Sequence, residues 1–183
     1  MKFTAPEGLN FAGWNTAADG SGTAYKAGAS QIYDQTGDLT LYAQWEAKSF
    51  SVDLNNDQWV DSGTTVDGNT VYKSDSGSYH VANGKSVATI TVTGYTTFTV
   101  YIRSYAESTW DYTEAFEADV TAVRDRSNPK SKYSTKGNQS NTTYTACTYN
   151  LDGGTHTIQI LYSKDGSGDN NDDRGYFYIP ANQ

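Results

Sequence analysis

Cysteine and histidine are scarce in this chain of 183 residues, which holds one cysteine, Cys147, and two histidines, His80 and His156. A single cysteine excludes a disulfide within the chain and a zinc site made of several cysteines. Three catalytic signatures are missing as well: the G-x-S-x-G turn, the H-E-x-x-H zinc motif and the phosphate-binding P-loop. No local pattern supports catalysis, and we expect a protein that is not an enzyme.

Long apolar runs and positive charge are also scarce. No stretch approaches the roughly 20 apolar residues that span a bilayer, and Met1-Lys2 leads directly into polar sequence without the apolar segment of a signal peptide. The 13 Lys and Arg residues are outnumbered by 21 Asp and Glu residues, which gives a net charge of -8. Because an acidic surface repels phosphate groups, we expect neither a nucleic-acid partner nor membrane insertion.

Strand-forming residues dominate what is present. Aromatic residues make up 14% of the chain, which contains 15 tyrosines, and a disordered segment would not carry so many. Thr, Tyr, Val, Ser and Gly suit pleated strands and tight turns, whereas Leu and Met, which favour helices, are few. The composition therefore predicts a folded, mainly all-β protein.

The first 46 residues form a region of their own, with turns and strands close together. The glycine-rich stretch Asp19-Gly20-Ser21-Gly22 indicates a turn. In residues 39–45 apolar side chains alternate with polar ones, which predicts a half-buried strand. Trp14 and Trp45 are the large side chains available for its core.

Three segments of this region occur in a distinctive order: F-x-G-W, then D-G-S-G-T, then L-Y-A-Q-W. This order resembles the Listeria–Bacteroides repeat, also called the internalin-type B repeat, over residues 3–46. The resemblance implies a small β-grasp-like module that is repeated in bacterial surface proteins and adhesins. The opening strand of that family, of the type V-T-Y-D-x-N-G-G, is not found before Phe3. We therefore expect a partial repeat within a fragment of a longer extracellular protein, a fragment that lacks its signal peptide.

Residues 47–183 contain several segments with a period of two, separated by Gly, Asn and Asp turns. The predicted strands are Phe50 to Leu54 and residues 88–93, 98–105, 111–120, 143–149, 155–163 and 176–179. In the segment 111–120 we place Tyr112, Phe116, Ala118 and Val120 on one face. The pattern predicts an antiparallel β-sandwich, jelly-roll-like in topology. The polar stretch 124–141 is predicted to be a long loop.

The same region has a second resemblance, carried by short strings such as Gly154-Thr155-His156-Thr157-Ile158 and Asp173-Arg174-Gly175-Tyr176-Phe177. In their order along the chain these strings are similar to galactose-binding-like β-sandwiches, which include many carbohydrate-binding modules. The resemblance implies recognition of a ligand on a concave face or at the loop end of the sandwich.

Aromatic and basic side chains of the strand 98–105 are candidate ligand-binding residues. Tyr101, Arg103 and Tyr105 share one face, and sugars are bound by aromatic rings together with charged or amide donors. Trp110 and Tyr112 in the following hairpin loop are further candidates. The alternative is that these tyrosines are ordinary strand formers on which the arginine stacks, and that Trp110 folds over the sandwich edge.

An acidic segment close to the C-terminus is a candidate calcium site. Calcium takes 6–8 oxygen ligands, and the carboxylates of this segment are those of Asp165, Asp169, Asp172 and Asp173. The alternative is a solvated hairpin loop without a cation.

We thus predict two units, a partial repeat over residues 1–46 that acts as a spacer or stalk and a β-sandwich over residues 47–183. The favoured hypothesis is a non-catalytic adhesion or carbohydrate-binding module of a multi-module bacterial surface protein. Its partner would be a glycan or a protein of a host or cell surface. The alternative hypothesis is a structural spacer or assembly module of a surface or phage-tail protein, with no small ligand.

Overall fold

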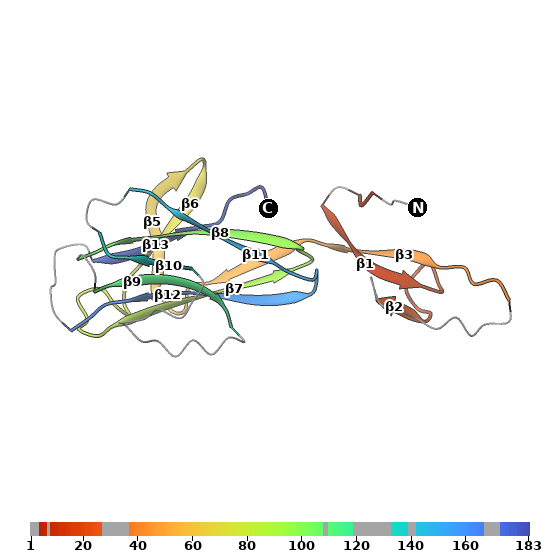
Figure 1. Cartoon of the computed structure of the whole chain (residues 1–183), viewed down its shortest axis with the longest axis horizontal. Helices are drawn as coiled ribbons and strands as arrows, with labels where there is room; N and C mark the ends of the chain where they lie inside the picture. The colour runs from red at the N-terminus through yellow and green to blue at the C-terminus, as the bar shows by residue number, and fades with distance from the viewer. Residues whose placement is uncertain are drawn as a thin grey trace.

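The structure is a computed structural model that describes residues 4–6, 8–26, 37–107, 110–118, 133–138, 142–166 and 173–183. All regular structure within these ranges consists of strands, β1 to β13, arranged in three sheets (Figure 1). The prediction of an all-β protein is confirmed. No helix capable of crossing a membrane occurs in the described ranges.

The N-terminal strands form a small antiparallel sheet in the order β2-β1-β3, with β1 at Leu9–Asn15, β2 at Ala24–Lys26 and β3 at Tyr42–Ala47. Phe11 of β1 lies opposite Trp45 of β3, and their ring centroids are 5.7 Å apart. The register shifts between Phe11 and Gly13. A Cβ at residue 13 would lie 2.6 Å from the carbonyl oxygen of Tyr25, so this close strand contact requires glycine.

The remaining strands form two five-stranded antiparallel sheets. Sheet one has the order β10-β9-β12-β7-β4 and consists of β10 (Tyr133–Lys136), β9 (Tyr112–Glu117), β12 (Thr155–Ser163), β7 (Lys85–Thr93) and β4 (Ser49–Asp53). Sheet two has the order β11-β8-β13-β6-β5 and consists of β11 (Thr145–Asn150), β8 (Thr97–Tyr105), β13 (Arg174–Tyr178), β6 (Asn69–Ser74) and β5 (Trp59–Val66). The pairs β5–β6 and β9–β10 are hairpins, and the other connections cross between the sheets. Such crossing is typical of jelly-roll-like sandwiches.

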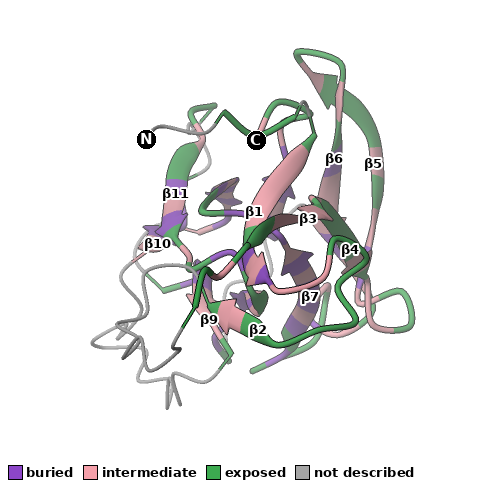
Figure 2. Ribbon diagram, turned by 90° about the vertical axis from the view of Figure 1, so that its right-hand side faces the viewer, coloured by how far each residue is buried: buried purple, intermediate pink, exposed green. Residues whose placement is uncertain are grey.

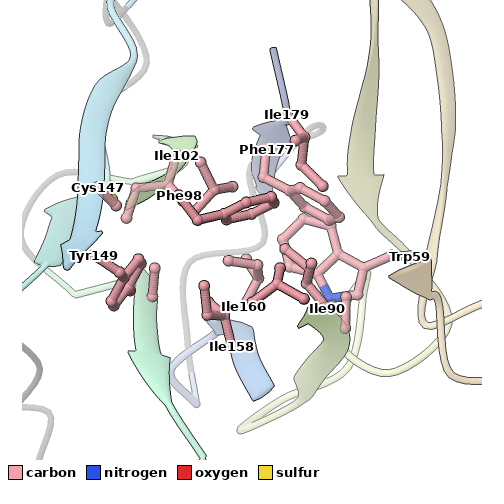
Figure 3. Packing of buried hydrophobic residues seen from close by; sticks show 14 of the residues in the cluster. Trp59, Ile90, Phe98, Ile102, Cys147, Tyr149, Ile158, Ile160, Phe177 and Ile179 are labelled. Atoms are coloured by element: carbon pink, nitrogen blue, oxygen red, sulfur yellow. The ribbon is translucent and has the colours of Figure 1, made fainter. Parts of the chain in front are cut away.

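The core lies between the two sheets and follows the predicted alternation. Fully buried apolar residues come from β7, β8 and β12: Ala88, Ile90, Val92, Phe98, Val100, Ile102, Ile158, Ile160 and Tyr162. Trp59, also fully buried, packs edge-on against Phe177 with ring centroids 4.9 Å apart (Figure 3). Each buried Val, Ile or Phe side chain contributes about 1.5–3 kcal/mol through its removal from water.

Two predictions about this region are wrong. In β9 the residue on the core side is Ala115, and Thr113 on the same face hydrogen-bonds the inward Ser104, so the apolar face predicted from Tyr112 and Phe116 is not the core face. Ala118 follows the strand, and Val120 lies outside the described residues. Residues 133–136 of the predicted loop form β10. Tyr133 packs there against Tyr149 with centroids 5.4 Å apart, which gives this short polar strand an apolar anchor.

The hairpin of β5 and β6 was not predicted, although its turn carries a clear signal. Asp67 and Gly68 both have positive φ, 49° and 79°, as a two-residue type I′ turn requires. Asp-Gly between two strands is a common sequence for that turn. The exposed residues of β5 weaken its alternation, which explains why the strand itself is difficult to recognise.

The connection between the N-terminal sheet and the sandwich is short, because Lys48 alone separates β3 from β4 (Figure 1). Two close backbone contacts lie at this junction. The backbone N–H of Lys48 donates to the carbonyl of Gly8. At Gly94, where φ is +80°, a Cβ would lie 3.0 Å from the carbonyl oxygen of Ala47. The residues of β1, β2 and β3 are mostly half-buried or exposed, whereas the sandwich strands hold the fully buried core (Figure 2).

Candidate functional site

The outer face of sheet two carries a cluster of tyrosines. Residues of β8 alternate between the core and this face, and the outward ones include Tyr101, Arg103 and Tyr105, which are half-buried. Neighbouring strands add further tyrosines at matching positions of the register. We call this surface the tyrosine face, and it consists of Tyr101, Tyr105, Tyr144, Tyr176 and Tyr178 together with Arg103.

The rings of the tyrosine face pack on one another across the strands. Tyr101 of β8 lies opposite Tyr178 of β13, and their rings are stacked with centroids 4.8 Å apart and planes 3° apart. Tyr144 meets Tyr178 edge-on at 5.0 Å. These contacts fix the side chains, so a ligand would meet a surface that is already ordered.

Arg103 lies among three of these rings. Its guanidinium carbon is 4.4 Å from the ring centroid of Tyr176, 5.1 Å from that of Tyr144 and 6.0 Å from that of Tyr105. Burial raises the pKa of Tyr144, and the charge of Arg103 together with its hydrogen bond to this tyrosine opposes the rise. The Tyr144 hydroxyl therefore stays protonated at neutral pH and is able to donate and accept hydrogen bonds.

Part of the tyrosine face is accessible from the side of β11. The residue opposite Tyr101 on that strand is Ala146, which is exposed and has only a methyl side chain. Tyr178 covers one face of the Tyr101 ring, whereas nothing larger than the methyl group of Ala146 stands opposite it on β11. Such an arrangement suits a sugar, whose C–H surface packs on a ring while its hydroxyls meet phenol and guanidinium groups.

Trp110 and Tyr112 do not lie in a hairpin loop as predicted, because the connection from β8 to β9 crosses between the sheets. Trp110 lies in this connection and Tyr112 is the first residue of β9, and their environments differ. Trp110 is 58% exposed, so its indole is available at the surface. Tyr112 is 6% exposed and offers little of its ring to a ligand. The tryptophan comes directly before Asp111, a fully buried carboxyl that precedes β9. The strand β9 begins at the end of the sandwich away from β1–β3 (Figure 1).

Of the predicted calcium ligands, Asp169 and Asp172 lie outside the described residues. Asp165 and Asp173 are both buried. Asp173 accepts the N–H of Glu107 at Oδ1, at 3.0 Å, and pairs with Lys164 at Oδ2, at 3.3 Å. Among the described residues, no three His, Cys, Asp or Glu side chains are grouped so that they could hold a metal ion. The calcium site stays a prediction.

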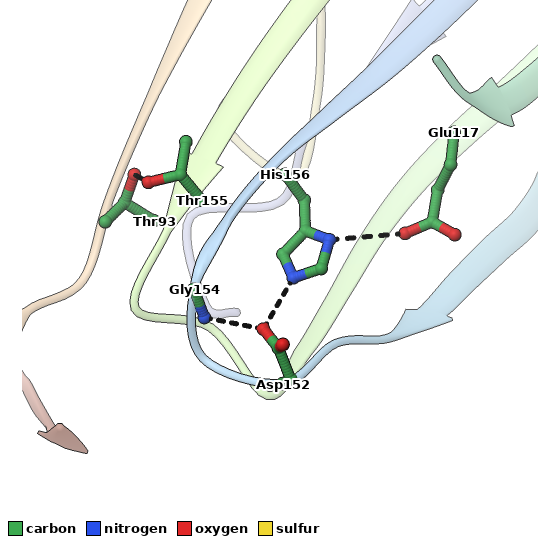
Figure 4. A network of polar contacts seen from close by, with 6 residues as sticks. All are labelled: Thr93, Glu117, Asp152, Gly154, Thr155 and His156. Carbon is green, nitrogen blue, oxygen red and sulfur yellow. Dashed lines mark hydrogen bonds and ion pairs between the residues drawn. The ribbon is translucent and has the colours of Figure 1, made fainter. Parts of the chain in front are cut away.

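A second polar cluster, which was not predicted as a site, surrounds His156 at the start of β12 (Figure 4). Nε2 of His156 lies 2.8 Å from Oδ1 of Asp152, and Nδ1 of His156 lies 3.5 Å from Oε1 of Glu117. A cavity of about 240 Å³ is lined by His156 and Glu117. A further cavity of about 320 Å³ is lined by Asp152, in the loop between β11 and β12, and by Phe11 of the N-terminal sheet.

The sequence gives only a weak signal for this cluster. Asp152 and His156 are four residues apart on either side of the Gly153-Gly154 turn, and a tight turn brings such positions together. Glu117 comes from β9, and only the register of β9 with β12 places it near. The cluster has the composition of an ion-pair network, with two carboxylates on either side of one imidazole.

Comparison with known proteins identifies the N-terminal sheet. Residues 3–44 match the Listeria-Bacteroides repeat domain. The resemblance predicted for the start of the chain is confirmed, and it links the chain to a repeat that occurs in surface proteins. The match includes β1, β2 and the first strand residues of β3 and does not extend into the sandwich.

A segment of the chain is also similar to a curated protein. Over 50 residues it is 44% identical to a putative Gly-rich membrane protein of Evansella cellulosilytica. The aligned segment is 27% of this chain and 6% of that protein, so the chain spans a small fraction of its relative. No solved structure matches the chain.

Proposed function

We propose that the sandwich is a non-catalytic glycan-binding module of a bacterial surface protein, and that the tyrosine face is its binding surface. The N-terminal repeat acts as the spacer that connects this module to the rest of the protein. The repeat match supports the surface-protein context. The location of the module outside the cell is part of the proposal.

The observation that carries the proposal is the ordered grouping of five tyrosines and one arginine on an outer sheet face, with the arginine among three of the rings. Outward positions of a sheet normally hold polar side chains without a common partner. Here the ring of Tyr178 contacts those of Tyr101 and Tyr144. The guanidinium carbon of Arg103 lies 4.4 Å from the ring centroid of Tyr176. Aromatic rings with a polar end are the side chains that serve most often as anchors in recognition surfaces.

Arg103 would set the orientation of the ligand. Its guanidinium presents several N–H donors in a fixed plane, and the surrounding rings exclude part of the solvent that would compete for them. A sugar hydroxyl or carboxylate that reaches this plane can accept two of these hydrogen bonds. The phenol groups supply additional donors and acceptors along the ligand.

The test is binding of the 183-residue chain to a glycan array, followed by affinity measurements with the glycan that binds best. Tyr101→Ala is expected to weaken binding about tenfold or more, because it removes the ring with the accessible side. Arg103→Lys keeps the charge but loses the planar donor set and is expected to weaken binding by a similar factor.

Tyr42→Ala is the matched control, since Tyr42 is 43% exposed and lies on β3, away from the tyrosine face. This variant should bind like the unchanged chain. Absence of binding to every glycan would favour a structural spacer or assembly module. Equal losses in Tyr101→Ala and Tyr42→Ala would place recognition outside the tyrosine face.

A further inference from the structure

A buried ion pair connects the ends of two strands that belong to opposite sheets. Lys164 follows β12 of sheet one and Asp173 precedes β13 of sheet two, at the end of the sandwich away from β1–β3 (Figure 1). Nζ of Lys164 lies 3.3 Å from Oδ2 of Asp173, and the two side chains are 3% and 2% exposed. Two charges so fully removed from water are costly to keep ionised.

The groups around the pair hold both partners in place. The N–H of Glu107 donates to Oδ1 of Asp173 at 3.0 Å, which leaves Oδ2 directed at the lysine. The backbone N–H of Lys164 donates to the carbonyl of Gly84 at 3.0 Å. The next N–H, that of Asp165, donates to the buried carboxylate of Asp111 at 2.8 Å. Asp111 is therefore a positioning residue for the lysine.

We propose that Lys164 and Asp173 become joined by an isopeptide bond. Within the buried pair a proton passes from the ammonium to Oδ2 across their 3.3 Å contact, which leaves a neutral amine next to a carboxylic acid. Nζ then attacks Cγ of Asp173 and forms the new N–C bond. The Cγ–Oδ2 bond breaks, and Oδ2 leaves as water with one proton from the carboxyl and one from the amine.

The geometry assigns separate roles to the two carboxyl oxygens. Oδ1 remains as the amide carbonyl, and it carries the negative charge of the tetrahedral intermediate. The N–H of Glu107 already donates to this oxygen, and a fixed donor at a developing oxyanion lowers the barrier. The reaction needs no oxidant and no cofactor, since its products are one amide and one water.

Such a bond would change how the sandwich resists unfolding. Its two sheets are connected by loops and by side-chain packing, and the bond would fasten β12 directly to β13. A cross-link also reduces the freedom of the unfolded chain. The inference does not depend on glycan binding, so the failure of either one leaves the other standing.

The test is the intact mass of the full 183-residue chain under denaturing conditions, followed by fragmentation. The expected mass is lower than that of the sequence by one water, with a branched peptide that links residues 164 and 173. A chain with the complete mass of its sequence would overturn the proposal.

Lys164→Arg keeps a positive charge without the reactive amine and is expected to have its complete mass. Persistence of the one-water deficit in this variant would trace it to another reaction, such as cyclisation at Asp165-Gly166, and would overturn the proposal. Lys136→Arg, the same substitution at an exposed lysine of β10, should keep the deficit.

Asp173→Asn offers a further discrimination, because the leaving group of an amide is ammonia. The expected deficit changes from one water to one ammonia, with the same two residues linked. A one-water deficit in this variant would contradict the assignment of Asp173 as the residue that is attacked.

Discussion

The N-terminal sheet and the sandwich bury their aromatic residues to very different extents. Phe11 contacts both Trp14 and Trp45, yet all three side chains are only partly buried. In the sandwich, Trp59 and Phe177 are fully enclosed between two sheets. Among the described residues before Lys48 there is one three-stranded sheet and no second layer packed on its aromatic face. The small sheet therefore depends on its contacts with the sandwich, whereas the sandwich has a complete core of its own.

The largest effect is expected from truncating the sandwich core. Trp59→Ala should lower the free energy of unfolding by about 3–5 kcal/mol, because it leaves a large cavity beside Phe177. The measurement is chemical denaturation followed by circular dichroism. Trp45→Ala is the matched variant in the small sheet and should leave the sandwich transition close to its original midpoint. A loss in Trp45→Ala as large as in Trp59→Ala would show that the two regions unfold as one unit.

The next largest effect is the pH dependence of stability that comes from Asp111, a buried carboxyl of the sandwich. Burial raises the pKa of Asp111 to about 6, above the ordinary value of an unfolded chain. The Asp111 carboxyl therefore binds its proton more tightly in the folded state than in the unfolded state. The stabilisation from Asp111 is complete below about pH 4 and is lost as the pH rises through about 6. The expected loss over that window is about 2–3 kcal/mol.

Denaturation at a series of pH values measures this effect. Asp111→Asn should remove the decline between pH 4 and 6, because asparagine keeps an oxygen acceptor for the N–H of Asp165 and does not titrate in this range. An unchanged decline in this variant would assign the titration to another group.

The junction between the two regions should give an intermediate effect. Gly94→Ala places a Cβ near the carbonyl oxygen of Ala47 at a residue with φ of +80°, and it is expected to cost about 1–2 kcal/mol. It should also speed trypsin cleavage after Lys48. Gly68 has φ of +79° and no atom near its Cβ position, so Gly68→Ala shares the backbone strain without the contact. Equal cleavage rates in the two variants would show that Gly94 does not support the junction.

The smallest effect is expected at Asp152. Hydrogen bonds from His156 and from the N–H of Gly154 hold the pKa of this exposed carboxyl below its ordinary value. Its contribution has the opposite sign to that of Asp111: it is present above the unfolded-state pKa and is lost as the pH falls through the folded-state pKa. Asp152→Asn should therefore lower the melting temperature slightly at neutral pH and not at pH 2. A decrease that grows on acidification would contradict this account.

The sequence predicts individual strands of this fold better than it predicts their neighbours. Alternation in β8 correctly identifies Phe98, Val100 and Ile102 as core residues and places Tyr101 and Arg103 together on the other face. Among the other tyrosines of that face, Tyr144 comes directly before β11, and Tyr176 and Tyr178 come from β13. Their position depends on strand order, which local periodicity does not encode.

The errors have a similar origin. Thr113 faces inward because its hydroxyl bonds Ser104, a partner that becomes visible only when β8 and β9 face one another from opposite sheets. The pairing of Lys164 with Asp173 likewise requires that the ends of β12 and β13 meet. The missed hairpin of β5 and β6 has a different origin. The Asp67-Gly68 dipeptide is itself a type I′ turn sequence, so local sequence alone is enough to predict this hairpin.

The central claim is that the tyrosine face is a recognition surface, and a titration followed by nuclear magnetic resonance of ring-labelled tyrosines tests it most directly. With the glycan selected on the array, the account predicts saturable shifts of Tyr101, Tyr144 and Tyr176. The signals of Tyr162 in the core and Tyr42 on β3 should remain in place. Shifts confined to tyrosines outside the tyrosine face, or none at saturating glycan, would contradict the claim.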